Sequence, residues 1–225
     1  MLPITRKADA EIQREVLEEL KWDPRVHETE VGVQVRGGIV TLTGTIDSYA
    51  KKVAAREAAH RVNGVLDVAD DLEVKPAGVM MRSDAEIAKA VRQALEWDVL
   101  VPETRIRSTV THGWVTLEGE VDSWAQRGDA ACAVERLSGV CGVTNKIAVN
   151  PRSVKADEIR ASIEEALRRQ AQREAKRLNI TVGDGIVTLS GTVRSWTEKN
   201  AIDRVAGFTR GVRRVDDKLV VDPYA

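Results

Sequence analysis

The sequence lacks any long apolar run. No stretch of its 225 residues approaches the ~18 consecutive apolar residues that a membrane-spanning helix requires. The first residues lead directly into a charged amphipathic segment, without the apolar core that defines a secretory signal. We therefore expect a cytoplasmic protein that does not span a membrane, either free or bound peripherally to a membrane surface. A periplasmic location is expected only if a signal peptide has been removed.

Cysteine and most aromatic residues are scarce. The two cysteines, Cys132 and Cys141, both lie in the middle third of the chain. A disulfide framework would recur with the repeats described below, so we expect two reduced thiols. One Phe and two Tyr stand against five Trp, which means that small cores must be aliphatic and rich in alanine. With 43% hydrophobic and 31% charged residues, the composition is that of a globular protein rather than a disordered one.

Residues that carry catalytic chemistry are few and scattered. The three histidines, His27, His60 and His112, stand at non-equivalent places, two near turns and one on a helix surface. They are too dispersed to complete a structural zinc site with the two cysteines. No Gly-Lys-Ser/Thr follows the Gly-rich turns, so these are hairpin loops rather than phosphate-binding loops. We expect a protein that is not an enzyme, with no catalytic residues, no metal site and no cofactor.

One pattern of apolar, glycine and turn residues occurs three times. A G-x-V-T-L-x-G-x-[VI] run recurs at offsets of 75 and then 72 residues, together with a Gly-Val pair and an apolar trio. The runs begin at Gly38, Gly113 and Gly185, the pairs are Gly64-Val65, Gly139-Val140 and Gly211-Val212, and the trios are Ile12/Val16/Leu20, Ile87/Val91/Leu95 and Ile159/Ile163/Leu167. Such repetition defines the architecture. We predict three domains, at residues 5–75, 82–150 and 154–223.

Each unit has the pattern of a helix, two strands, a second helix and a last strand. The apolar trio at i, i+4 and i+8 predicts a helix with one buried stripe. Alternation at Val31, Val33 and Val35 predicts a strand with one buried face. The following pairs predict hairpin turns: Gly37-Gly38, His112-Gly113 and Asp184-Gly185. We therefore predict an α+β fold of three tandem small domains, each with two helices packed on one face of a three-stranded mixed sheet.

Several positions carry a local expectation in all three units. An acid precedes the first helix, where it suits the helix dipole: Asp9, Asp84 and Asp157. A glycine within the second strand predicts a bulge or the close approach of another backbone: Gly44, Gly119 and Gly191. A serine is suited to cap the second helix: Ser48, Ser123 and Ser195. In the third unit, residues 168–177 contain no Pro, Gly or Trp, so the first helix is expected to run longer there.

These residues resemble the signature of the BON domain, named for bacterial OsmY and nodulation proteins. The resemblance rests on the G-x-V-T-L-x-G-x-[VI] run, the Ser-capped helix, and a final G-V-x-x-V-x-[ND]-x-[IL]-x-V motif, which is clearest over residues 139–149 and 211–221. It covers nearly the whole chain. It implies a non-catalytic α/β module, often tied to envelope or osmotic stress, whose members associate with phospholipid, small ions or partner proteins. Most members are periplasmic, whereas this chain is more similar to cytoplasmic triple-BON proteins of bacteria.

Charge is unevenly distributed among the three units. The whole chain has a net charge of −1, but residues 151–225 hold 15 Lys/Arg against 11 Asp/Glu, giving +4, while residues 1–75 and 76–150 are net acidic. The third unit is therefore where an anionic partner is most plausible. The candidate lipid- or anion-binding residues are Arg168, Arg169, Arg173, Lys176, Arg177, Arg210, Arg213 and Arg214. The alternative is an ordinary solvated helix face, because nearby glutamates partly neutralise it.

Two sets of aromatic residues recur at aligned positions. Tyr49, Trp124 and Trp196 follow the cap of the second helix. They either close the end of a small core or pack on the next unit, or else serve as anchors at a lipid–water interface. Trp22 and Trp97 are expected to pack at the end of the first helix.

Three functions are compatible with these features. The first is peripheral association with anionic phospholipid or another anionic partner, mainly through the third unit, in a stress-related role. The second is a protein-interaction scaffold or small oligomer that presents edge strands and Trp-lined surfaces. The third and weakest is an ion- or metabolite-sensing module. The acid pairs Asp70-Asp71 and Asp216-Asp217 are expected to face solvent, and they are the candidate residues for cation binding. No nucleic-acid partner is expected, because aromatic and basic residues do not interleave.

Overall fold

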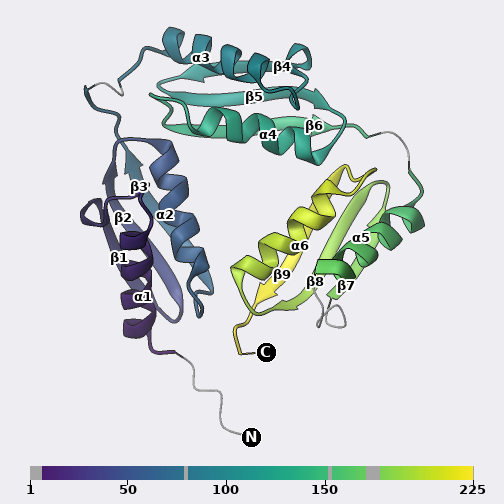
Figure 1. Cartoon of the computed structure of the whole chain (residues 1–225), viewed down its shortest axis with the longest axis horizontal. Coiled ribbons are helices and arrows are strands. Elements are labelled where there is room, and N and C mark those ends of the chain that lie inside the picture. The colour runs from purple at the N-terminus through teal and green to yellow at the C-terminus, as the bar shows by residue number, and fades with distance from the viewer. Residues whose placement is uncertain (1–6, 79–80, 152–153, 171–177, 225) are drawn as a thin grey trace, which may run out of the picture. The chain divides into compact units, whose positions relative to one another are not determined.

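The computed structural model describes residues 7–78, 81–151, 154–170 and 178–224. Each repeat contains two helices packed against a three-stranded sheet (Figure 1). The first repeat comprises α1 (Asp9–Trp22), β1 (Val31–Arg36), β2 (Ile39–Ile46), α2 (Tyr49–Arg61) and β3 (Asp67–Val74). The second comprises α3 (Asp84–Trp97), β4 (Ile106–Thr111), β5 (Trp114–Val121), α4 (Trp124–Glu135) and β6 (Gly142–Val149). The third comprises α5 (Ala156–Gln170), β7 (Leu178–Gly183), β8 (Ile186–Val193), α6 (Trp196–Phe208) and β9 (Arg214–Val221).

The sheets are mixed, which confirms the predicted α+β class. The strand order in the first repeat is β1-β2-β3, with β1 and β2 antiparallel and β2 and β3 parallel, and the second repeat has the same pairing. The hairpin turns have positive φ at both residues, 58° and 82° at Gly37 and Gly38, as a two-residue turn of this kind requires. Because the parallel partner needs a crossover, the second helix connects the central strand to the last strand.

The core of each repeat lies between its helices and one face of its sheet. The apolar trio of the first helix is buried in all three repeats. On the central strand β2, Val40, Leu42 and Ile46 are buried while the intervening side chains are not. Four alanines of α2 are fully buried: Ala54, Ala55, Ala58 and Ala59. Small side chains at these positions allow the helix backbone to approach the sheet closely, so a unit of this size still reaches dense packing.

The glycine within the second strand marks a close approach of backbone rather than a bulge. β1 and β2 pair residue for residue through Val31 and Gly44, with no extra residue. A Cβ on Gly44 would lie 2.2 Å from the carbonyl oxygen of Glu30, and its φ is 134°. Gly119 has the same relation to the Arg105 carbonyl oxygen, at 2.1 Å. Only glycine fits a position with this φ and this contact.

The predicted serine caps are present in part. Ser123 accepts a hydrogen bond from the Gln126 N–H at 3.2 Å, and Ser195 accepts one from the Glu198 N–H at 3.2 Å. Ser48 occupies the same N-cap position, but its side chain makes no capping bond. The expected lengthening of the third repeat's first helix concerns residues 171–177, which lie outside the described residues.

An aspartate at the start of the first helix holds the hairpin turn of its own repeat. The two oxygens of Asp9 accept from the backbone N–H groups of Gly37 at 2.8 Å and Gly38 at 3.0 Å. Asp84 accepts in the same way from His112 and Gly113, both at 2.8 Å. The predicted acid thus binds two turn amides as well as suiting the helix dipole. We name this arrangement the turn clamp.

The expectation that an acid precedes each first helix needs correction. Asp9 and Asp84 are the first residues of α1 and α3. Asp157 is the second residue of α5. The apolar trio fixes the register, since Asp9 and Asp84 stand three residues before Ile12 and Ile87. In the third repeat that position is Ala156, three residues before Ile159.

A basic side chain from the second helix covers the free edge of the last strand. Lys52 donates to the carbonyl oxygen of Leu72 at 2.6 Å. At the equivalent position Arg127 donates to the carbonyl oxygens of Ile147 at 3.0 Å and Asn145 at 2.8 Å. β3 and β6 are edge strands, whose open carbonyls would otherwise be available to another strand. The edge is therefore closed by the repeat itself.

The Asn or Asp of the last-strand motif forms a further hydrogen bond along the same edge strand. Its side-chain oxygen accepts from the backbone N–H two residues on, as Asn145 does from Ile147 at 3.1 Å and Asp217 from Leu219 at 2.8 Å. Asp70 is at the equivalent position and lies 3.5 Å from the Lys52 ammonium, with its side chain only 12% exposed. The prediction that the pair Asp70-Asp71 faces solvent is thus wrong for Asp70, because the side chains of a strand alternate between faces.

We predict that Arg127→Met lowers the stability of the second repeat by about 1–3 kcal/mol, the usual cost of leaving buried polar groups without a partner. Arg127→Lys should retain most of that stability, since Lys52 performs the same role. Hydrogen exchange of the β6 amides measures the effect locally. Arg107→Met, at an exposed position of β4, is the matched control. Equal protection in the two methionine variants would contradict the edge-covering role.

The turn clamp also predicts a pH dependence. Hydrogen bonds from the Gly113 and His112 amides hold the pKa of Asp84 below its ordinary value. A carboxyl group with a lowered folded-state pKa contributes stability above its unfolded value, about 3.9, and loses it as pH falls through the folded value. Asp84→Asn should therefore destabilise the second repeat at neutral pH, and its difference from wild type should shrink in acid.

Hydrogen exchange of the second repeat at neutral and acidic pH checks this result. Asp157→Asn is the control, because that acid also stands in the first turn of its helix but, within the described part of the chain, accepts no hydrogen bond from a turn. A destabilisation by Asp84→Asn that does not change with pH would argue against a carboxylate clamp.

Candidate functional site

The predicted basic residues fall into two groups at opposite ends of the third repeat. Arg168 and Arg169 lie in the last turn of α5, which is 15 residues long, about 22 Å. The other group is Arg210, Arg213 and Arg214, between α6 and β9. The Arg213 backbone N–H donates to the Gly185 carbonyl in the β7–β8 turn at 2.7 Å, which places this group beside the turn. The predicted candidates Arg173, Lys176 and Arg177 lie outside the described residues.

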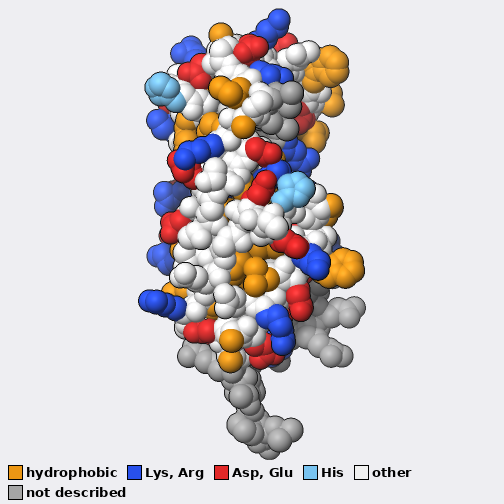
Figure 2. All heavy atoms as spheres, turned by 90° about the vertical axis from the view of Figure 1, so that its left-hand side faces the viewer, with side chains coloured by type: hydrophobic (Ala, Val, Ile, Leu, Met, Phe, Trp, Pro, Cys, Tyr) orange, Lys and Arg blue, Asp and Glu red, His pale blue; other side chains and the backbone are white. Residues whose placement is uncertain are grey.

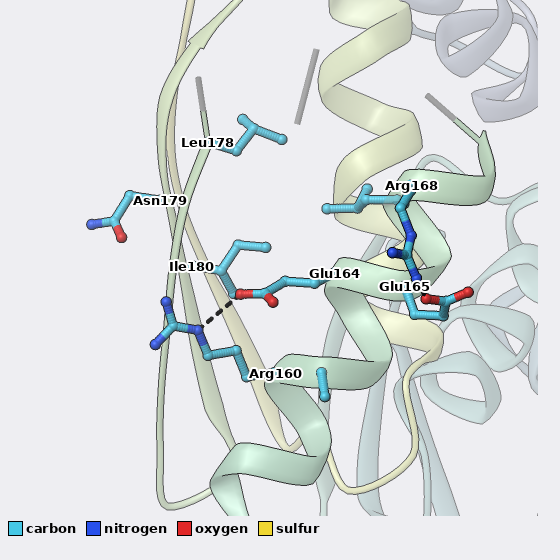
Figure 3. Close-up of a pocket in the computed structure, with 9 residues that line it drawn as sticks. Arg160, Glu164, Glu165, Arg168, Leu178, Asn179 and Ile180 are labelled. Atoms are coloured by element: carbon cyan, nitrogen blue, oxygen red, sulfur yellow. Dashed lines mark hydrogen bonds and ion pairs between the residues drawn. The ribbon is translucent and has the colours of Figure 1, made fainter. Parts of the chain in front are cut away.

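The group on α5 is partly neutralised by its own helix. A cavity of about 420 Å³ lies between α5 and β7, and Figure 3 shows its charged side chains in pairs. Arg160 donates to Glu164 at 3.0 Å, and Arg168 forms an ion pair with Glu165. Leu178, Asn179 and Ile180 line the opposite wall. A cavity with equal numbers of opposite charges is not selective for an anion.

The group beside the turn is exposed and has no acidic partner. Arg210, Arg213 and Arg214 are all exposed to solvent. Among the residues that the structure describes, no carboxylate lies within 4.0 Å of any of their guanidinium groups. We call these three residues the turn-end arginines. Within the described residues, they and Arg169 are the members of the predicted set that have no acidic partner.

Charges elsewhere are mixed in sign. Figure 2 shows one face of the molecule, on which Lys/Arg and Asp/Glu side chains are interspersed with apolar ones rather than gathered by sign. In the first repeat, many of these charges are paired. Lys51 lies 2.9 Å from Asp47, and Arg61 lies 2.6 Å from Glu19 and 3.0 Å from the buried Asp23. Hydrogen bonds from Arg25 and Arg61 hold the pKa of Asp23 far below its ordinary value. These charges stabilise the fold and do not form a surface of one sign.

The predicted interfacial aromatics are half-buried. Tyr49, Trp124 and Trp196 are the first residues of the second helices. The guanidinium of Arg127 lies 4.8 Å from the centroid of the Trp124 ring, and the Lys199 ammonium lies 5.0 Å from that of Trp196. Each of the two tryptophan rings thus supports a basic side chain of the same helix through a cation–π contact.

The exposed aromatic residues are different ones. The prediction that Trp22 and Trp97 pack at the ends of their helices is wrong, since each is 80% exposed. Trp22 comes two positions after the core residue Leu20, about 200° around the helix and so on its outer side. In the second repeat Val99 and Leu100 follow Trp97 and are 99% and 64% exposed. Sequence reasoning missed this group, although three large apolar residues within a helix-ending loop were a visible signal.

Sites for metal or thiol chemistry are not found in the part of the chain that the structure describes. No group of three or more His, Cys, Asp or Glu side chains there is arranged to hold a metal ion. Cys132 and Cys141 are not joined in a disulfide. Burial, and to a lesser degree the negative charge of Asp84, raises the pKa of the Cys141 thiol. A raised pKa makes a thiol less reactive at neutral pH. Within the same residues, no helix combines the length and apolar character needed to cross a bilayer.

Known proteins resemble this chain at the level of its repeats. Osmotically-inducible protein Y of Escherichia coli (strain K12) is 30% identical over 143 residues, which span 62% of this chain and 71% of that protein. A solved structure of CdsD, a structural protein of the type III secretion system of Chlamydia trachomatis, aligns over 93% of this chain and 91% of its own. At 12% identity and a TM-score of 0.27, that alignment carries no argument. The BON domain profile matches residues 8–76, 83–151 and 155–223. The chain therefore belongs to the BON domain family, of which it contains three copies.

Proposed function

We propose that this protein is a non-catalytic binding protein that associates peripherally with anionic phospholipid through its third repeat. The observation that carries the proposal is the group of turn-end arginines, which are exposed and have no acidic partner among the described residues. The name of its relative, Osmotically-inducible protein Y, supports a role under osmotic stress. Binding at a membrane surface is compatible with a cytoplasmic or a periplasmic location.

The charge distribution favours a weak and reversible interaction. A basic residue near an anionic membrane contributes about 1 kcal/mol, so three contribute about 3 kcal/mol at low salt. The attraction decays within a Debye length, about 8 Å at physiological ionic strength. Because the first two repeats are net acidic, the third repeat should face the membrane. Binding should therefore be sensitive to salt and confined to anionic vesicles.

We predict that the protein floats with phosphatidylglycerol/cardiolipin vesicles at low salt, but not at high salt and not with purely zwitterionic vesicles. Reversing the turn-end arginines to Glu should abolish flotation, because attraction becomes repulsion. Reversing Arg168 and Arg169 should weaken it less, since Arg168 is already paired with Glu165.

The matched control is the triple variant Arg14→Glu, Lys21→Glu and Arg36→Glu in the first repeat. These residues are exposed, and their reversal alters net charge by the same amount as reversal of the turn-end arginines. If the control variant loses flotation equally, binding follows total charge and the assignment to the third repeat is wrong. Absence of flotation by the wild type with anionic vesicles at low salt would refute lipid binding itself.

A protein-interaction scaffold is the second candidate, and one observation favours it. Trp97, the last residue of α3, and Val99 and Leu100 in the loop that follows it are large apolar residues exposed within four positions of one another. Large aromatic side chains are the commonest anchors of protein interfaces. Pairing through the last strands of the sheets is disfavoured, because Lys52 and Arg127 cover these edges. At the β3 and β6 edges an interface should therefore use side chains rather than strand addition, whereas β1 and β4 are the other edges of these sheets.

We expect such an interface to show as self-association that increases with protein concentration and persists at high salt. The triple variant Trp97→Ala, Val99→Ser and Leu100→Ser should be monomeric. Sedimentation velocity over a concentration series measures this, with Trp22→Ala as the control for loss of one exposed tryptophan. A wild-type protein that stays monomeric throughout would count against a self-assembling scaffold.

A further inference from the structure

The third repeat keeps the hairpin turn that the clamp binds in the other two repeats. Its turn residues Asp184 and Gly185 have φ values of 51° and 75°, the same as those of His112 and Gly113. In every repeat, one backbone hydrogen bond joins the turn to the segment that precedes the last strand. Gly38, Gly113 and Gly185 accept through their carbonyl oxygens from residues 66, 141 and 213, at 2.9, 2.9 and 2.7 Å. The two amide N–H groups that bind a carboxylate in the second repeat therefore have direct counterparts in the third.

The carboxylate itself is missing from the third repeat. Ala156 is the first residue of α5, where α1 and α3 begin with Asp9 and Asp84. A methyl group cannot accept a hydrogen bond. No side chain among the described residues accepts from the amides of Asp184 and Gly185. The turn clamp has lost its acceptor and kept its donors.

A cavity occupies the place of the missing side chain. Ala156, Asp184, Gly185 and Arg213 line a cavity of about 500 Å³, together with Pro151, Val154 and Gly211. The cavity at the equivalent turn of the first repeat has about 50 Å³, and Lys7 and Tyr224 line it as well as Asp9. The additional space is open to solvent and adjoins the two turn amides. It is large enough for a small organic anion.

A positive charge has been gained where the negative one was lost. The residue that packs against the second turn glycine is Leu66 in the first repeat and Cys141 in the second. In the third repeat it is Arg213, whose Cβ lies 3.3 Å from the position that a Cβ on Gly185 would take. Replacement of Asp by Ala and of a neutral side chain by Arg removes a negative charge from the site and adds a positive one. Two changes act in the opposite sense: Val154 stands where Lys7 and Arg82 pack in the first two repeats, and the turn itself carries the exposed carboxylate of Asp184.

We propose that the β7–β8 turn of the third repeat is a binding site for the carboxylate group of a small organic acid. The backbone N–H groups of Asp184 and Gly185 donate to its two oxygens, as those of His112 and Gly113 donate to the two oxygens of Asp84. Arg213 supplies the positive charge. A carboxylate that accepts two N–H groups and faces a guanidinium is held by charge-assisted hydrogen bonds. The inference rests on the comparison of the repeats and does not require that the protein binds a membrane.

The test is a titration of the ¹⁵N-labelled full chain with sodium acetate, followed through the amide resonances of Asp184 and Gly185. Sodium chloride at equal ionic strength is the reference. We expect saturable shifts of these two resonances with acetate and none with chloride. Ala156→Asp should abolish the response and raise the melting temperature, because the chain then supplies its own carboxylate. Arg213→Leu, which restores the residue type of the first repeat, should weaken binding.

Asp84→Ala is the matched control, since it opens the equivalent turn of the second repeat. Its His112 and Gly113 amides should become sensitive to acetate, whereas they are insensitive in the wild type. If they respond while Asp184 and Gly185 do not, the third-repeat site is closed and the proposal is overturned.

A response of Ala156→Asp equal to that of the wild type would overturn it as well. A stronger response to phosphate than to acetate would overturn the assignment to carboxylates. Because Ala156→Asp keeps the turn-end arginines, its flotation with vesicles separates the two proposals.

Discussion

Each repeat depends on the close packing of two short helices against one face of a three-stranded sheet. A unit of about 70 residues buries little apolar surface, so its core must be dense to be stable at all. The buried alanines of α2 bring that helix close to the sheet, and Gly44 lets the strands meet where any side chain would collide with the Glu30 carbonyl. Because the core is this small, polar contacts at the sheet edge and at the hairpin turn also contribute to defining the fold.

Those polar contacts distinguish the three repeats. The edge contact made by Lys52 in the first repeat is made by Arg127 in the second, so a basic residue is retained where it covers backbone carbonyls. The turn clamp is retained in two repeats, with Ala156 in the place of its aspartate in the third. A scaffold that recurs with one internal contact removed leaves backbone donors able to bind a partner from solution. Functional differences within a tandem array can therefore arise from the loss of a stabilising contact.

Surface features follow the same logic. Arg168 resembles the turn-end arginines in sequence, but its helix provides Glu165 as a partner, whereas Arg210, Arg213 and Arg214 have no acidic partner among the described residues. Tyr49, Trp124 and Trp196 recur because each begins a second helix, and the two tryptophans lie beneath a basic side chain. Trp97 is exposed because its helix ends there. The exposed and unpaired residues, rather than the recurring ones, are the better candidates for binding.

The sequence alone determined the three repeats, the order of their elements and the buried stripe of each first helix, because apolar periodicity and glycine positions reflect constraints that act within a few residues. It also predicted that the mid-strand glycines mark either a bulge or a close approach of backbone, and the structure shows the close approach. Only the tertiary structure decided which charges are neutralised, since the partner of a charge can come from another element. The structure alone showed the clamp between Asp84 and a turn 28 residues away, and the edge-covering role of Arg127. Contacts of this kind depend on the register between elements, which short-range patterns do not encode.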